Sequence, residues 1–107
     1  MSQLPKVTEQ AARHYSIVAL KRRFKGGFYL GGFKSDCTHR ISRTRVRCSV
    51  GWFQGDAVFN GHTEIWYSGH AGAVEWNYSY TITAVDTYCY QVQHRPLSRC
   101  SRQYHVS

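Results

Sequence analysis

In the ten residues 43–52 the apolar side chains fall on every second position. The apolar positions are Val46, Cys48, Val50 and Trp52. The polar positions are Arg43, Arg45, Arg47 and Ser49. Because successive side chains of a strand point to opposite faces, this stretch predicts a half-buried strand with a basic outer surface. We expect the rest of the chain to pair with this strand, cover its apolar side or be tied to it.

A hairpin follows, because Gly55-Asp56 can form a two-residue turn that sets Gln54 opposite Ala57. On the inner face this register pairs Trp52 with Phe59, Val50 with Gly61, Cys48 with Thr63 and Val46 with Ile65. On the outer face it pairs Ser49 with His62, Arg47 with Glu64 and Arg45 with Trp66. A slip of one residue would expose the apolar set of one strand, so the pattern favours this register. It also predicts an Arg47–Glu64 ion pair and a cation–π contact between Arg45 and Trp66.

The second strand of the hairpin is expected over about 57–68, and the clearest alternation of the chain follows it, from Val74 to Ala84. The parity breaks at Val85-Asp86, which is compatible with a bulge in one long strand or with a turn into a fourth strand. We favour the bulge, so that the third strand continues to about residue 93. The basic tail 94–107 is expected to be irregular and fastened by Cys100.

Residues of about 5–25 predict a helix, with Pro5 in its first turn and Gly26-Gly27 at its end. The expected apolar stripe is Val7, Ala11, Tyr15 and Val18 together with Ala12 and Ala19. The last turn is basic: Lys21, Arg22, Arg23 and Lys25. These cations either complement the helix dipole or form an anion-binding patch. Residues 28–33 are expected as an edge strand or a lining loop, and 34–39 as a loop anchored by Cys37.

Together these elements predict one α+β domain spanning residues 1–107. One N-terminal helix packs on a three- to four-stranded antiparallel meander over about residues 43–93.

The chain has four cysteines, at positions 37, 48, 89 and 100, and none forms a C-x-x-C pair. An even number in a small domain indicates two disulfides, for which three connectivities exist. We favour Cys37–Cys48 and Cys89–Cys100, since each would pin a loop to a strand and stabilise the fold by about 3 kcal/mol. Disulfides indicate a secreted, periplasmic or cell-surface protein. No signal peptide or membrane span is visible, so an exported chain would here begin after the cleavage site with Met1 added.

The net charge of +8 favours an anionic partner: a protein, the cell wall, lipid or nucleic acid. A charge of this size can also simply keep a small domain soluble. The expected contact residues are Arg40, Arg43, Arg45, Arg47 and Trp66 on the sheet, with Lys21 and Arg22 at the helix end. Trp66 would equally suit an oligomer interface.

The run from Cys37 to Trp52, with Arg40, Ser42, Thr44, Val46, Cys48 and Val50 in register, resembles a C-x-R-x-S-x-T-x-V-x-C-x-V pattern of small uncharacterised exported bacterial domains. The resemblance covers about residues 8–66. It implies an extracytoplasmic location and a Cys37–Cys48 disulfide, and it implies no activity. The helix-on-meander outline is also similar to cystatin-type folds. The Q-x-V-x-G hairpin of those inhibitors is absent, so their function does not carry over.

The alternative function is a small secreted ribonuclease-like hydrolase that uses His62, Glu64 and Arg47. A carboxylate base, a histidine acid and a guanidinium for a phosphate are the groups such a reaction needs, and barnase-type ribonucleases carry them on an antiparallel sheet. His94 and His105 are only loosely placed as a second acid. Exposed strands also carry mixed charges merely to stay solvated. We therefore expect a binding module rather than an enzyme, with no metal or other cofactor.

Overall fold

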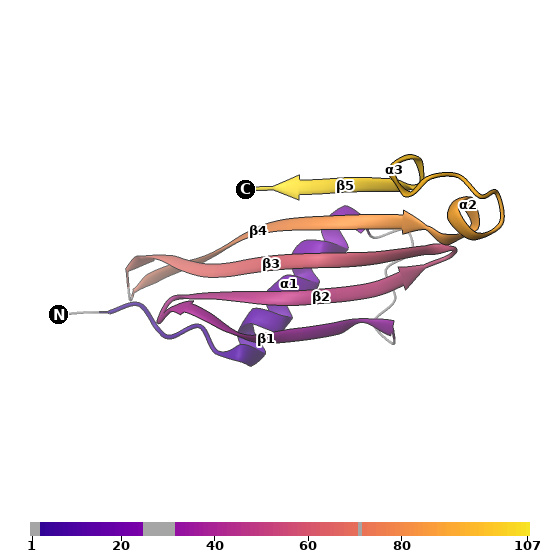
Figure 1. Ribbon diagram of the computed structural model, residues 1–107. Helices are drawn as coiled ribbons and strands as arrows, with labels where there is room; N and C mark the ends of the chain where they lie inside the picture. Colours follow the sequence, from indigo (N-terminus) through magenta and orange to yellow (C-terminus); the bar gives the residue numbers. More distant parts are fainter. Residues whose placement is uncertain (1–2, 25–31, 71) are drawn as a thin grey trace.

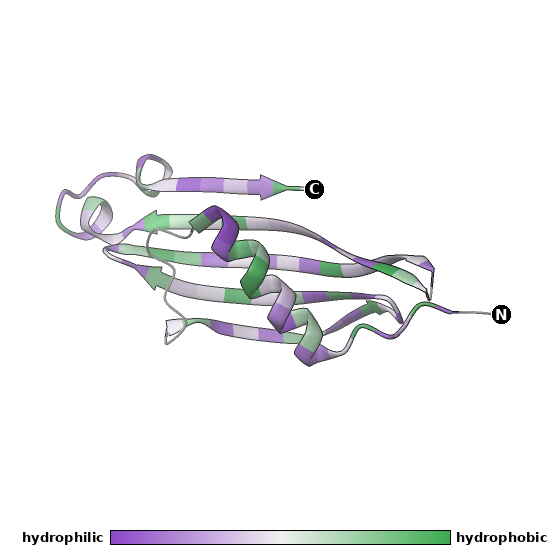
Figure 2. Cartoon of the chain, turned by 180° about the vertical axis from the view of Figure 1, so that it is seen from behind, coloured by the Kyte–Doolittle hydropathy of each residue, from purple (hydrophilic) through white to green (hydrophobic). Residues whose placement is uncertain are grey.

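The computed structural model describes residues 3–24, 32–70 and 72–107. The chain has an α+β fold in which helix α1 (Glu9–Phe24) lies across one face of an antiparallel sheet (Figures 1 and 2). The sheet has five strands in the order β1-β2-β3-β4-β5: β1 (Lys34–Ser42), β2 (Arg45–Gln54), β3 (Ala57–His70), β4 (Ala73–Asp86) and β5 (Ser101–Val106). Two short helices, α2 (Thr87–Gln91) and α3 (Leu97–Cys100), lie between β4 and β5 at one end of the sheet (Figure 1).

The β2–β3 hairpin has the register that the sequence predicts, from Gln54 opposite Ala57 to Arg45 opposite Trp66. Its two-residue turn places Gly55 at φ 59°, a conformation that glycine adopts without strain. The four apolar residues predicted on the inner face of β2 are all buried: Val46, Cys48, Val50 and Trp52. The predicted half-buried strand is therefore confirmed, except that β2 begins at Arg45 and Arg43 lies in the turn before it.

The sheet has five strands, where three to four were expected, because one further strand forms at each edge. Residues 34–42, which we expected to begin as a loop, form the edge strand β1 paired with β2. Residues 101–106 of the supposedly irregular tail form β5, paired with β4. Both segments have weak alternation of their own, so pairing with a neighbouring strand, and not local preference, decides their conformation. The predicted segment 28–33 lies mostly outside the described residues, and only its last residues, Gly32 and the buried Phe33, are described.

The predicted bulge at Val85-Asp86 is wrong, because β4 ends at Asp86 and α2 begins at once. The Asp86 side chain accepts a hydrogen bond from the Cys89 amide and so caps α2. Helix α1 likewise begins later than predicted. Thr8 Oγ1 accepts a hydrogen bond from the Ala11 amide, and this N-cap, not Pro5, sets the first turn.

The core lies between α1 and the inner face of the sheet. The buried side of α1 consists of Ala12, Ser16, Ala19, Leu20 and Phe24. The predicted stripe is thus rotated, because Ala11, Tyr15 and Val18 are only half-buried. Phe24 packs edge-on against Trp52 and Phe59, whose rings stack with centroids 4.9 Å apart. The hydroxyls of Ser16 and Thr63 satisfy each other across the interface at 2.6 Å.

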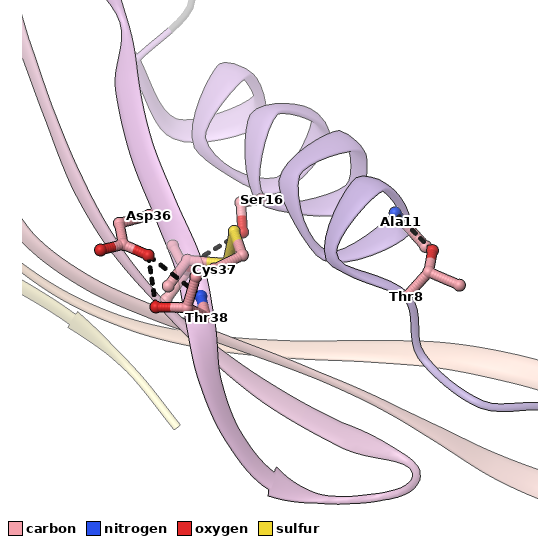
Figure 3. The surroundings of a disulfide bond; sticks show 8 residues. Thr8, Ala11, Ser16, Asp36, Cys37 and Thr38 are labelled. Carbon is pink, nitrogen blue, oxygen red and sulfur yellow. Dashed lines mark hydrogen bonds between the residues drawn. A yellow bond between two sulfur atoms is a disulfide. The ribbon is translucent and has the colours of Figure 1, made fainter.

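Both predicted disulfides form. Cys37–Cys48 joins β1 to β2 beneath α1, close to Ser16 (Figure 3). Cys89–Cys100 joins α2 to α3 and so fixes the connection that returns the chain into β5. They tie strand to strand and helix to helix, where we expected loop to strand.

Candidate functional site

The face of the sheet opposite α1, here called the outer face, is covered by no other element of the described residues (Figure 1). Residues that pair across antiparallel strands share a face, so the register places two polar rows on it. One row runs through His39, Arg47, Glu64 and Ser79. The adjacent row runs through Asp36, Ser49, His62, Thr81 and His105.

Glu64 holds two arginines of β2 in place. Its Oε2 accepts hydrogen bonds from Arg45 Nε at 2.8 Å and Nη2 at 2.5 Å. Its Oε1 accepts from Arg47 Nε at 3.1 Å and Nη2 at 2.8 Å. The predicted Arg47–Glu64 ion pair is thus confirmed, and Arg45 joins it. Fork-shaped pairing of this kind fixes both guanidinium planes.

Burial by itself would raise the pKa of Glu64, but the hydrogen bonds and charges of Arg45 and Arg47 outweigh it, and the pKa of this carboxyl is lowered. Glu64 therefore stays ionised through neutral and mildly acidic pH. A carboxylate held this way is poorly suited to accept a proton from a substrate.

Trp66 also lies on the outer face. The Arg45 guanidinium lies 4.2 Å from the centroid of the Trp66 ring, as the register predicts. Trp66 is half-buried, so the arginine occupies part of the surface that we expected to be available for stacking.

Arg40 and Arg43 lie away from this cluster. The Arg40 guanidinium donates to the carbonyl oxygens of Ser42, Arg43 and Val7, the last at 2.5 Å. Arg43 donates to the Leu4 carbonyl and accepts at its own carbonyl from the Val7 amide. Both side chains thus fasten the extended segment before α1 to the β1–β2 turn. Of the three arginines predicted on the basic outer surface of the strand 43–52, Arg45 and Arg47 lie there and Arg43 does not.

Lys21 and Arg22 are exposed on the last turn of α1, on the opposite side of the sheet. The Arg22 guanidinium lies 5.1 Å from the centroid of the Trp76 ring. Arg23 lies similarly over Tyr104, at 4.8 Å. The predicted binding residues therefore fall on separate surfaces.

A hollow of about 380 Å³ lies beside the Glu64 cluster on the outer face. Its lining includes Arg47, His62, Glu64, Ser79, Thr81 and His105. His105 reaches it because β5 pairs with β4 so that His105 faces Thr81, which in turn faces His62. The His105 Nδ1 lies 3.0 Å from Thr81 Oγ1. His94, at φ 54°, lies in the connection between α2 and α3 and does not line the hollow.

The sequence predicts His62, Glu64 and Arg47 together but places His105 only loosely, with His94, as a second acid. The available signal was the short alternation of Gln103 and His105 with Tyr104 and Val106. That signal is four residues long and contains no turn to fix its register, so it could not identify the neighbouring strand.

The described residues contain no candidate metal site and no free thiol. No three His, Cys, Asp or Glu side chains there converge in a way that could hold a metal ion. The four cysteines are all joined in disulfides. No helix in the described ranges has the length and apolar character needed to cross a membrane.

Comparisons with known proteins find no matching family model, no similar curated protein and no similar solved structure. The resemblances to exported bacterial domains and to cystatin-type folds therefore stay predictions. The function has to be argued from the geometry of the outer face.

Proposed function

We propose that the protein is a small disulfide-tied, extracytoplasmic binding module that holds an anionic partner on its outer face. The observation that carries the proposal is the gathering of Arg47, His62 and His105 around one hollow on the face that α1 leaves open. The net charge of +8 would draw anions towards such a face. The two disulfides support a location outside the cytoplasm, since they persist in oxidising compartments.

Arg47 is the side chain best placed to contact the partner. It lines the hollow, and 46% of its side chain is exposed although Glu64 already binds it. Glu64 satisfies one edge of the guanidinium and holds its plane, which lowers the entropy lost when a second anion binds. We therefore assign Glu64 a positioning role.

A salt titration with a charge-matched control tests this function. Binding of a fluorescently labelled 12-nucleotide single-stranded RNA is measured by anisotropy between about 50 and 200 mM salt. We expect affinity to fall steeply with salt, and Arg47→Gln to lower the slope of log K against log salt by about one. Arg95→Gln removes the same charge from the exposed α2–α3 connection and should leave most of the affinity. Binding that ignores salt, or equal losses in both variants, would contradict the proposal.

A ribonuclease-like hydrolase is the second candidate, favoured by one specific observation: His105 lies across Thr81 from His62 in the same hollow. One histidine would take the proton of the 2′-hydroxyl as its oxygen bonds to phosphorus. The other would give a proton to the 5′-oxygen as the phosphorus–oxygen bond breaks, leaving a 2′,3′-cyclic phosphate. In this mechanism Glu64, whose charge is balanced by two guanidinium groups, would position Arg47. Absence of both 2′,3′-cyclic phosphate and 3′-phosphate ends after prolonged incubation with RNA would exclude this candidate.

A further inference from the structure

The two histidines of the hollow stand on strands that flank a common neighbour. His62 on β3 and His105 on β5 both face Thr81 on β4. With neighbouring strands about 4.8 Å apart, their backbones are separated by about 10 Å. Both side chains are exposed and both line the hollow. The spacing leaves room for one small oxyanion between the imidazoles.

Thr81 orients one of the two rings. The 3.0 Å contact between Thr81 Oγ1 and His105 Nδ1 uses one ring nitrogen of His105. In a protonated imidazole both nitrogens carry a hydrogen. Nδ1–H then donates to the Thr81 hydroxyl, and Nε2–H becomes the donor for a bound anion.

The remaining charges around the hollow are fixed across mildly acidic pH. On β2 and β3, Arg45 and Arg47 face Glu64, whose pKa is lowered. On β1, the Thr38 side-chain and backbone hydrogen bonds lower the pKa of Asp36. From β4, Ser79, Tyr80 and Thr81 line it, and Ser107 lines it beyond β5. Histidine is the side chain that ordinarily gains charge between about pH 8 and pH 5, and His39 on β1 is the third one of this face.

We propose that this hollow binds the phosphodiester groups of an anionic polymer between His62 and His105, and that protonation of the two histidines switches the binding on. The proposal rests on the proposed function and adds to it the chemical class of the partner and its regulation. Donors reach the hollow from β2, β3 and β5, which suits a tetrahedral oxyanion better than a planar carboxylate. Two added positive charges near one phosphate strengthen binding by about tenfold even where water screens them.

The test compares affinities at pH 5.5 and pH 7.5 at one fixed salt concentration. The probes are the 12-nucleotide RNA, a poly(glycerol phosphate) chain of similar charge and polyaspartate. We expect the two phosphodiester polymers to bind about tenfold more tightly at the lower pH, and polyaspartate to show less than half that gain. Equal binding of RNA and poly(glycerol phosphate) identifies the phosphate backbone as the recognised group, whereas binding of RNA alone would contradict backbone recognition.

The variants are His62→Gln, His105→Gln and the double variant, with His14→Gln on the exposed side of α1 as the matched control. Each single variant should reduce the pH effect to about threefold and the double variant should remove most of what remains. The His14 variant should keep it in full. Thr81→Val, which retains a β-branched side chain but removes the hydroxyl partner of His105, leaves both imidazoles in place and should lose less of the pH effect than His105→Gln. Circular dichroism at both pH values checks that each variant is folded.

Failure of the two proposals is distinguishable. If the folded protein binds none of the polymers at either pH, the proposed function is wrong and this inference falls with it. If binding is salt-dependent but equal at both pH values, or if the double variant keeps the full pH effect, only the histidine switch is wrong.

Discussion

Replacing Glu64 by Gln has opposite expected effects on stability and on binding. The change removes the charge that balances Arg45 and Arg47 but keeps the shape and one acceptor oxygen. The exposed fractions are 38% and 46% for the two arginine side chains and 14% for Glu64. Pairs this open to solvent contribute about 0.2–1 kcal/mol each. We therefore expect Glu64→Gln to lower the free energy of unfolding by about 1 kcal/mol.

Binding should change in the other direction. The outer face gains one positive charge, and both guanidinium groups become available to an external anion. A unit charge about 7 Å from a phosphate in a water-like environment strengthens binding about threefold. Urea unfolding gives the stability, and the RNA anisotropy assay gives the affinity. Glu75→Gln, which removes the same charge from an exposed position on β4, is the matched control and should change both quantities less.

The pH dependence follows from the lowered pKa of Glu64. A carboxyl whose folded pKa lies below its unfolded pKa contributes stability above the unfolded value, and this contribution is lost as pH falls through the folded pKa. The stability difference between the parent and Glu64→Gln should therefore be present at pH 7 and shrink below about pH 4. A folded Glu64→Gln variant that binds RNA more weakly than the parent would refute the expected gain in affinity from the added positive charge.

Three further predictions concern the scaffold beneath the outer face. Ser16→Ala leaves the Thr63 hydroxyl buried without its partner at 2.6 Å and should destabilise by about 1–3 kcal/mol, and adding Thr63→Val should recover part of that loss in urea titrations. Gly61→Ala would drive its new methyl group into the backbone of β4, so we expect loss of the β3–β4 pairing, seen as lost amide protection in hydrogen exchange. Removing the Cys89–Cys100 disulfide should cost about 3 kcal/mol in denaturant titrations and selectively increase exchange in β5.

The centre of the sheet could be predicted from the sequence, because the Gly55-Asp56 turn and the apolar alternation of Val46 to Trp52 both require the same register. With that register, the contacts among Arg45, Arg47, Glu64 and Trp66 follow from cross-strand neighbours alone. Both disulfides favoured from the sequence form, although they join strand to strand and helix to helix where we expected loop to strand.

The two edge strands could not be predicted. Both β1 and β5 have weak alternation of their own, and they form because they pair with β2 and β4. The sequence from His94 onward shows no regular pattern. The disulfide between α2 and α3 fixes the connection that brings β5 back to β4. His105 therefore enters the hollow through tertiary structure. Arg40 and Arg43 are the opposite case. The sequence suggests that both are available to bind a partner, but each donates a hydrogen bond to a backbone carbonyl of the segment before α1.

Backbone amide shifts of the ¹⁵N-labelled protein, recorded during titration with the 12-nucleotide RNA at pH 5.5, test the location of the binding surface most directly. The account predicts that the largest changes fall on Arg47, His62, Glu64, Thr81 and His105, with little change along α1. Changes concentrated instead around Lys21 and Arg22, or spread evenly over the surface, would contradict the assignment of binding to the outer face.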